Sequence, residues 1–168
     1  MRFTLLCCFL ALFTFSPRCE AMPAEWQDSF REALQLIIDM RPKYTWGGAE
    51  SLDKGLDCSG YIFLACKWAG IPGITRTTAL NMARGMGGWQ GDDVEWHQSE
   101  PLDLIWWTFP SKPDRIHGHV GVLWYDNDGY HMVTHASASR NRVVVDKLRY
   151  SLWDDISKIR HLTIGDKP

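Results

Sequence analysis

The hydrophobic pattern of this 168-residue chain changes from helical to strand-like near Leu102. Before that point apolar residues recur at spacings of three and four, most clearly over residues 23–40, where polar residues fill the positions between them. After it, five short runs of aromatic and β-branched residues follow one another, and turn-forming residues separate most of them. Helices followed by consecutive strands predict an α+β fold, with N-terminal helices packed on a mainly antiparallel five-stranded sheet.

The expected elements can be placed along the chain. Helices are predicted over residues 23–40 and 58–70, with shorter ones over 78–84 and 152–158. Strands are predicted over residues 103–109, 119–125, 130–135, 142–146 and 159–164. The segment 85–100 is expected to be irregular.

Residues 1–21 have the composition of a cleaved secretory signal peptide. A short basic start precedes an apolar segment over residues 5–15 that is too short for a stable membrane anchor. Small residues precede a cut after Ala21, whereas Pro17 and Arg18 make Cys19 a poor site for lipidation. We therefore expect a secreted or periplasmic protein of the cell envelope, with residues 22–168 forming one domain.

The charge balance favours neither nucleic acid nor a membrane surface as a partner. The whole chain has a formal net charge of −2. Loss of Arg2, Arg18 and Glu20 with the signal peptide removes a net charge of +1, so the mature chain carries −3. Nothing in this balance indicates binding to polyanions, and it does not predict an oligomeric state.

Signal cleavage would leave two cysteines, Cys58 and Cys66. On one predicted helix they would lie about 12 Å apart along the axis, which is beyond disulfide reach. A secreted chain that keeps thiols without a disulfide framework suggests that at least one is kept for its reactivity.

Cys58 is the better candidate for a nucleophile. It begins the predicted helix, and Asp57 before it is a plausible N-cap. A thiol in the first helical turn faces unpaired backbone N–H groups and the positive end of the helix dipole, and both favour the thiolate. The alternative is a small buried core residue, a role that suits Cys66 in mid-helix better.

Two histidines on neighbouring predicted strands are suited to activate this thiol. Asp126-Asn127-Asp128-Gly129 predicts a hairpin turn between the strands of His119 and His135. A three-residue loop before Gly129 would place the two histidines directly opposite each other, because paired residue numbers would sum to 254. His119 would then take the proton of Cys58, and His135 would orient the His119 ring.

His117 and His131 add an H-x-H and an H-x3-H pattern to the same strands, so a metal site is conceivable. Zinc sites normally use three or four ligands, and no CxxC or HExxH motif accompanies these histidines. We expect no metal and no cofactor, and we expect His117 to line the rim of a cleft.

Six short motifs occur in order over residues 44–145. They are Tyr44-Thr45-Trp46-Gly47-Gly48, Asp57-Cys58-Ser59-Gly60-Tyr61, Arg76-Thr77-Thr78, Asp103-Leu104-Ile105-Trp106, His119-Val120-Gly121-Val122 and Thr134-His135-Ala136-Ser137. Each motif alone is weak, but together their order and spacing resemble the NlpC-type cysteine peptidases of bacterial cell-wall peptides.

The resemblance implies a papain-like fold and a cysteine endopeptidase that hydrolyses amide bonds in peptidoglycan stem peptides, often between D-glutamate and the diamino acid. It implies Cys58 as the nucleophile, His119 as the base and His135 as the orienting residue, with Tyr44 helping to bind the oxyanion. Substrate contacts are expected from the residues around these groups, namely Asp57, Ser59, Arg76 and His117.

Several alternatives stay open. Tyr44 could simply pack against Trp46, and Asp57 could act only as a helix cap. The same scaffold could carry an N-acetylmuramoyl-alanine amidase, an acyltransferase or a non-catalytic wall-binding protein. Leu102 stands where the family commonly has glycine, and the Trp-rich segment 85–96 has no counterpart that aligns, so these departures concern substrate choice more than chemistry.

Overall fold

The computed structural model describes residues 22–108, 113–114, 116–125, 131–148 and 155–163. The predicted signal peptide and the predicted turn at residues 126–129 lie outside these ranges. Within the described ranges, none of the helices combines the length and the apolar character that crossing a membrane requires.

Helix α1 (Ala24–Met40) confirms the first predicted helix. Its buried residues Phe30, Leu34 and Ile37 recur at spacings of three and four, as an amphipathic helix requires. The helix ends at Arg41, whose backbone turns into the left-handed region with φ 48° directly before Pro42.

Helix α2 (Cys58–Trp68) carries the candidate nucleophile at its first residue. Asp57 is the N-cap, as predicted, because its side chain accepts a hydrogen bond from the Gly60 N–H at 2.6 Å. Tyr61 anchors the helix to the sheet through a 2.9 Å hydrogen bond between its hydroxyl and that of Thr134. The short α3 (Ala79–Ala83) follows, capped by Thr78, and then the 3₁₀ turns η1 (Met86–Gly88) and η2 (Trp96–Gln98).

The sheet has six antiparallel strands in the order β1-β6-β2-β3-β4-β5. They are β1 (Gly91–Asp93), β2 (Leu104–Trp107), β3 (His119–Tyr125), β4 (His131–Ser137), β5 (Arg142–Lys147) and β6 (Ile156–Leu162). The predicted antiparallel α+β class is confirmed, but the expected five strands become six. The added strand, β1, is a Gly-Asp-Asp segment that pairs with β6, although glycine and aspartate are uncommon in strands.

The helix expected over residues 152–158 is wrong at its C-terminal end. Strand β6 begins at Ile156, which pairs with Trp107 of β2. Residues 152–154 lie outside the described ranges. Sheet pairing therefore overrides the local helical pattern where the two compete.

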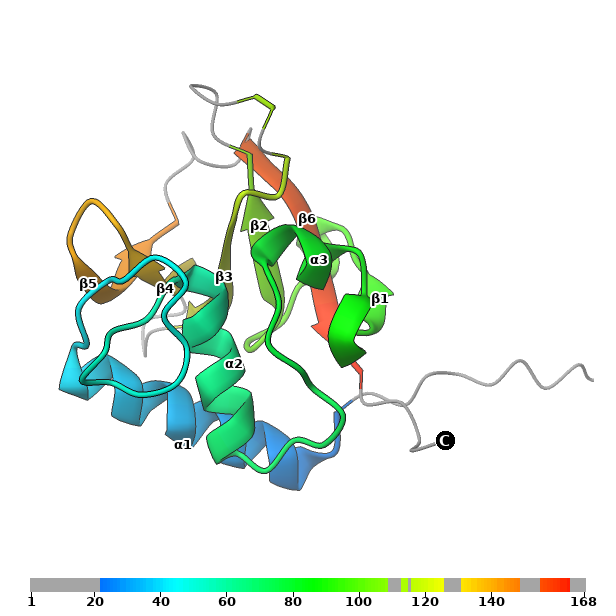
Figure 1. The fold of residues 1–168 in the computed structure, drawn as a ribbon. Helices are drawn as coiled ribbons and strands as arrows, with labels where there is room; N and C mark the ends of the chain where they lie inside the picture. Colours follow the sequence, from blue (N-terminus) through cyan, green and yellow to red (C-terminus); the bar gives the residue numbers. More distant parts are fainter. Residues whose placement is uncertain (1–21, 109–112, 115, 126–130, 149–154, 164–168) are drawn as a thin grey trace, which may run out of the picture.

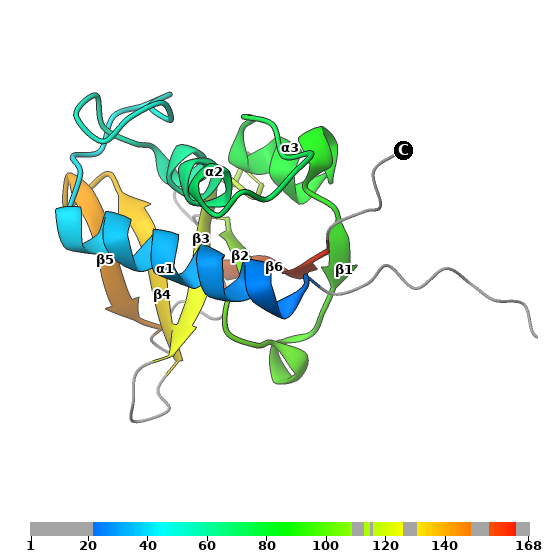
Figure 2. The same cartoon turned by 90° about the horizontal axis from the view of Figure 1, so that it is seen from below.

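The two faces of the sheet bury different clusters. Figures 1 and 2 show α1 and α2 on one side of the sheet, and there the side chains of Val120 and Val122 join the main core. Alternation along β3 turns Leu123 to the other face, where it packs with Trp107 in a smaller cluster. The partly buried side chains of Val94, Trp96 and Ile156 pack against this second cluster.

Candidate active site

The start of α2 lies directly against the turn that precedes it in sequence. Gly60 must lack a side chain, because a Cβ there would lie 1.9 Å from the carbonyl oxygen of Gly48. The same oxygen accepts a hydrogen bond from the Asp57 N–H at 2.9 Å. Tyr44, at the beginning of the turn segment, forms a parallel β-bridge with Leu56, two residues before Cys58.

Three residues predicted to contact substrate, Asp57, Ser59 and Arg76, hydrogen-bond to one another. The two carboxylate oxygens of Asp57 accept from Gly60 N and Ser59 Oγ on one side, and from Gly47 N and Arg76 Nη2 on the other, at 2.6 to 3.0 Å. Arg76 also donates to Ser59 Oγ at 2.7 Å. Because its acceptor sites are occupied, Asp57 serves to hold the helix start and the turn together.

Cys58 is buried, with only 6% of its surface exposed. Burial and the nearby Asp57 carboxylate raise the pKa of its thiol to about 11, although the backbone N–H groups of Val120 and Ser59 hydrogen-bond to the sulfur and act in the opposite direction. The expected thiolate at the helix start is therefore wrong for the unliganded protein, since desolvation outweighs the helix terminus. The bond from Val120 also places the sulfur at the first residues of β3, next to His119 in the chain.

His119 and His135 are brought together, as predicted, but through a different register. Val122 pairs with Thr134, so paired residue numbers sum to 256 and not 254. This shift leaves the histidines on the same face but diagonal to each other. Their rings meet edge to face, with Nε2 of His119 at 2.7 Å from Nδ1 of His135.

Trp107 covers the histidine pair from the neighbouring strand. The centroid of its ring lies 5.5 Å from that of His119 and 6.0 Å from that of His135. Burial, together with the neighbouring His135, lowers the pKa of His119 to about 3, so its imidazole is neutral at physiological pH. Gly121 leaves room for this arrangement, because a Cβ there would lie 3.1 Å from the Trp107 ring.

Two functional candidates were missed by reasoning from the sequence. Nε2 of His135 lies 3.2 Å from Oδ2 of Asp146 on β5, and the other carboxylate oxygen of Asp146 accepts from Arg140. The hydrogen bond from His135 lowers the pKa of Asp146, and Arg140 lowers it further. The alternation of β5 and the antiparallel order could have placed Asp146 on the histidine face, had the register been known.

A cleft of about 450 Å³ opens beside these residues. Tyr44, Trp46, Trp107, His119, His135, Arg140 and Asp146 are among the side chains that line it. Burial and the nearby Cys58 raise the pKa of Tyr44 to about 12, which keeps its hydroxyl protonated and able to donate. Cys58 is not among the residues that line the cleft, but it is close enough to Tyr44 to affect its pKa, and its sulfur accepts a hydrogen bond from Val120 at the start of β3.

His117 is not among the residues that line this cleft. Its backbone has φ 53°, and its Nδ1 lies 2.7 Å from the hydroxyl of Ser157 on β6. The side chain thus contacts the strand on the far side of β2, and the rim position expected for it is not what the structure shows. Within the described ranges, no group of three or more His, Cys, Asp or Glu side chains is arranged to hold a metal ion.

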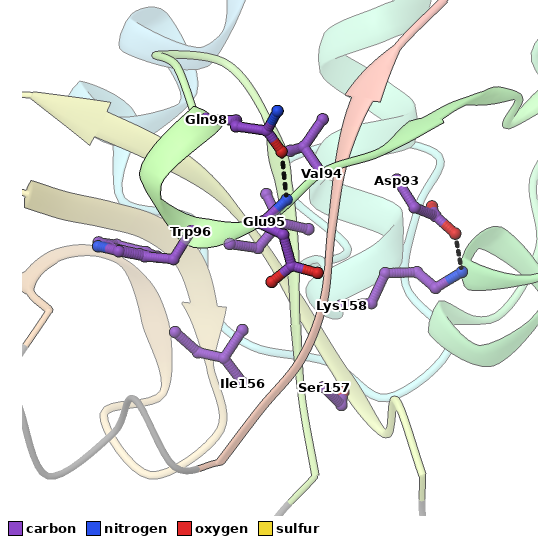
Figure 3. A pocket seen from close by; sticks show the side chains of 9 residues that line it. Asp93, Val94, Glu95, Trp96, Gln98, Ile156, Ser157 and Lys158 are labelled. Carbon is purple, nitrogen blue, oxygen red and sulfur yellow. Dashed lines mark hydrogen bonds and ion pairs between the residues drawn. The ribbon is translucent and has the colours of Figure 1, made fainter.

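A second hollow of about 440 Å³ lies between β6 and the segment that joins β1 to η2, as Figure 3 shows. Its charged groups are already engaged within the protein. Lys158 Nζ donates to Asp93 Oδ2 at 2.7 Å, and the side chain of Glu95 caps η2. The cleft that holds both histidines is therefore the candidate active site.

The comparisons with known proteins agree with this geometry. The model of the NlpC/P60 family matches residues 41–160, well over half of the chain. The chain belongs to the NlpC/P60 family. No curated protein sequence matches it.

Solved structures show the NlpC/P60 fold in several bacteria. An NLP/P60 family protein similar to a lipoprotein, from Staphylococcus aureus, is 17% identical with a TM-score of 0.67, covering 89% of this chain and 45% of that protein. An NlpC/P60 protein of Bacillus cereus is 23% identical with a TM-score of 0.58, covering 86% and 42%. The peptidoglycan hydrolase RipB of Mycobacterium tuberculosis is 20% identical with a TM-score of 0.53, covering 87% and 74%. The chain thus spans less than half the length of the first two proteins.

Proposed function

We propose that this NlpC/P60 protein is a cysteine endopeptidase that hydrolyses amide bonds in the stem peptides of peptidoglycan. Its catalytic residues would be Cys58, His119 and His135. The observation that carries the proposal is the 2.7 Å contact between the two imidazoles at the start of β3, where the Val120 N–H hydrogen-bonds to the Cys58 sulfur. The description of the similar RipB as a peptidoglycan hydrolase supports the choice of substrate.

In the first half of the reaction, Cys58 would lose its proton to Nδ1 of His119, because Nε2 of that ring faces His135. In the same step the sulfur forms a bond with the carbonyl carbon of the substrate, and the carbonyl oxygen gains the negative charge. The Tyr44 hydroxyl would donate a hydrogen bond to this oxygen. The C–N bond breaks as His119 returns the proton to the leaving amine nitrogen, which leaves a thioester on Cys58.

In the second half, a water molecule would attack the thioester carbon. His119 takes one proton from the water and passes it to the departing sulfur, which restores the Cys58 thiol and releases the carboxylic acid. Both histidine and cysteine thus end in the state in which they began.

The resting pair is neutral in this proposal. The raised pKa of Cys58, about 11, and the lowered pKa of His119, about 3, both disfavour a thiolate and imidazolium in the unliganded site. Proton transfer would therefore accompany the attack on a bound substrate and would not precede it.

The finer assignments follow from the family resemblance. We propose cleavage between D-glutamate and the diamino acid, and action in the cell envelope after removal of the signal peptide near Ala21. The composition of residues 1–21 supports the second assignment.

Digestion of purified peptidoglycan, with mass-spectrometric assignment of the new termini, tests the proposal. The wild-type protein should release fragments with a new amino terminus on the diamino acid. Cys58→Ala should abolish release without loss of thermal stability, while Cys66→Ala is a matched control on the same helix that should still cut. Cleavage between sugar and peptide would instead indicate an amidase, and transfer of the acyl group to an added amine would indicate an acyltransferase. Binding without any cleavage by the wild type would indicate a wall-binding protein.

A further inference from the structure

We infer that Asp146 fixes which ring nitrogens of His135 and His119 carry protons, and is thereby a positioning residue for the base. The inference extends the proposed function, because it concerns the readiness of His119 to accept a proton from Cys58. It rests on three side chains that run across three neighbouring strands, β3, β4 and β5.

The three side chains form a continuous diagonal on one face of the sheet. On β4 and β5, His135 pairs with Val144 while Asp146 pairs with Val133, so His135 and Asp146 lie one diagonal step apart. The register of β3 and β4 gives His119 and His135 the same relationship. Diagonal neighbours are about 7–8 Å apart at the backbone, a span that side chains of this length can bridge.

The carboxylate decides the direction of every hydrogen bond along this diagonal. Ionised Asp146 can only accept, so the Nε2 of His135 at 3.2 Å must carry the proton. A neutral His135 then has an unprotonated Nδ1, which accepts from Nε2–H of His119 at 2.7 Å. The proton of His119 is thus on Nε2, and its Nδ1 is the atom with the lone pair.

The opposite arrangement would disable the base. If His135 carried its proton on Nδ1, it would donate to Nε2 of His119, and His119 would hold its own proton on Nδ1. No thiol proton could then be accepted there. The unprotonated Nε2 of His135 would also face the carboxylate of Asp146. Two hydrogen-bond acceptors would then face each other with no proton between them, which is unfavourable.

Arg140 completes the arrangement from the far side of Asp146. It donates to Oδ1, which leaves Oδ2 directed to His135. Each carboxylate oxygen thus has its own donor. An amide at position 146 could not satisfy both donors, because it has one oxygen and one NH₂ group.

Asp146→Asn tests the inference for this reason. Arg140 should hold the amide oxygen and turn the NH₂ group toward His135, which forces both histidines into the unproductive form. We expect kcat/KM on muropeptides to fall about 10- to 100-fold, the range found for residues that orient metal-bound histidines through a hydrogen bond. The double variant Arg140→Ala/Asp146→Asn frees the amide to turn its oxygen toward His135, and should recover most of the lost activity.

Nitrogen-15 NMR of the histidine side chains gives a readout that does not depend on cleavage. Wild-type protein should carry protons on Nε2 of both His119 and His135, and Asp146→Asn should carry them on Nδ1. Asp92→Asn, which changes an exposed carboxylate on the opposite edge strand, should match the wild type in both measurements.

The inference is wrong if Asp146→Asn leaves both protons on Nε2, or if it cleaves as fast as the wild type. It is also wrong if the double variant is no more active than Asp146→Asn, because the loss would then be structural. A wild-type protein that does not cleave muropeptides would refute the proposed function alone, since the NMR result would still decide the role of Asp146.

Discussion

His119 and His135 contact each other across β3 and β4 without being a directly paired couple. The distance of 2.7 Å between Nε2 and Nδ1 is reached along the diagonal, because the register sum of 256 places Gly121 and not His119 on the line across from His135. A shift of the sum by two leaves both side chains on one face of the sheet. The contact is therefore insensitive to the error in the predicted register, whereas a register sum that differed by one would have placed the two rings on opposite faces of the sheet.

The raised pKa of Cys58 predicts slow alkylation of the free protein in mildly acidic solution. Below a pKa of about 11, the thiolate fraction rises tenfold with each pH unit, so the rate with iodoacetamide should keep rising up to about pH 10. The raised pKa also makes the stability of the fold depend on pH. Because the folded protein favours the thiol, Cys58 contributes stability below pH 9.0, and this stability is lost as the pH rises toward 11. Peptide mapping by mass spectrometry should find the label on Cys58 and not on Cys66, and a rate that levels off below pH 8 would contradict the prediction.

Replacing Tyr44 by Phe removes the hydroxyl but keeps the ring in the cleft. If the hydroxyl stabilises the oxyanion, kcat should fall about 100-fold while KM changes little, as when one oxyanion donor is removed in other enzymes. The pKa of about 12 means that the hydroxyl is protonated throughout the working range, so the loss should not depend on pH below about 10. Steady-state kinetics on a defined muropeptide decide the matter, and an unchanged kcat would leave Tyr44 with a packing role only.

Arg76→Ala should destabilise the fold more than it weakens substrate binding. The change removes one of the donors to the buried Asp57 and the bond to Ser59, which together should lower the free energy of unfolding by about 1–3 kcal/mol. Lys54→Ala is a suitable control, because it breaks a pair with Glu50 that is exposed on both sides and should leave the free energy of unfolding nearly unchanged. Urea denaturation of the two variants and the wild type measures both changes in the free energy of unfolding. A stable Arg76→Ala protein with a raised KM would show instead that the guanidinium contacts substrate.

Leu102 affects the stability of the fold in two opposing ways, through its strained backbone and its buried side chain, and two substitutions can separate them. Its φ of 78° lies in the left-handed region, which costs a non-glycine residue about 1–2 kcal/mol, yet its side chain is buried. Burial of a leucine is worth about 1.5–3 kcal/mol, so Leu102→Gly should be slightly less stable than the wild type. Leu102→Ala loses most of this burial and keeps the strain, and it should be the least stable of the three in thermal denaturation. An alanine variant more stable than the glycine variant would show that the strain is relieved elsewhere.

The positive φ at Leu102 bears on the glycine that the family resemblance leads us to expect at this position. Glycine adopts a left-handed backbone without the steric cost that leucine has there. The chain keeps that backbone with leucine, and Asp103 after it is held by Glu100 N at 2.7 Å and by His161 Nδ1 at 2.5 Å.

Sequence patterns predicted the helix start at Cys58 and the face shared by His119 and His135, because capping chemistry and strand alternation are local rules. They did not predict β1, since three polar residues become a strand only by pairing with β6. They also missed Asp146, whose contact with His135 depends on the register of β4 and β5. The direction of the Cys58 pKa was wrong because burial is a property of the whole packed core.

Cys66 has no surface exposure, and Cys58 has 6%; both are free thiols within the described part of the chain. The packed body that carries the cleft is thus held together without any cross-link between these two sulfurs. Dithiothreitol or a similar reductant can be kept in every assay to protect Cys58 from oxidation, with no bond in this region for the reagent to cut.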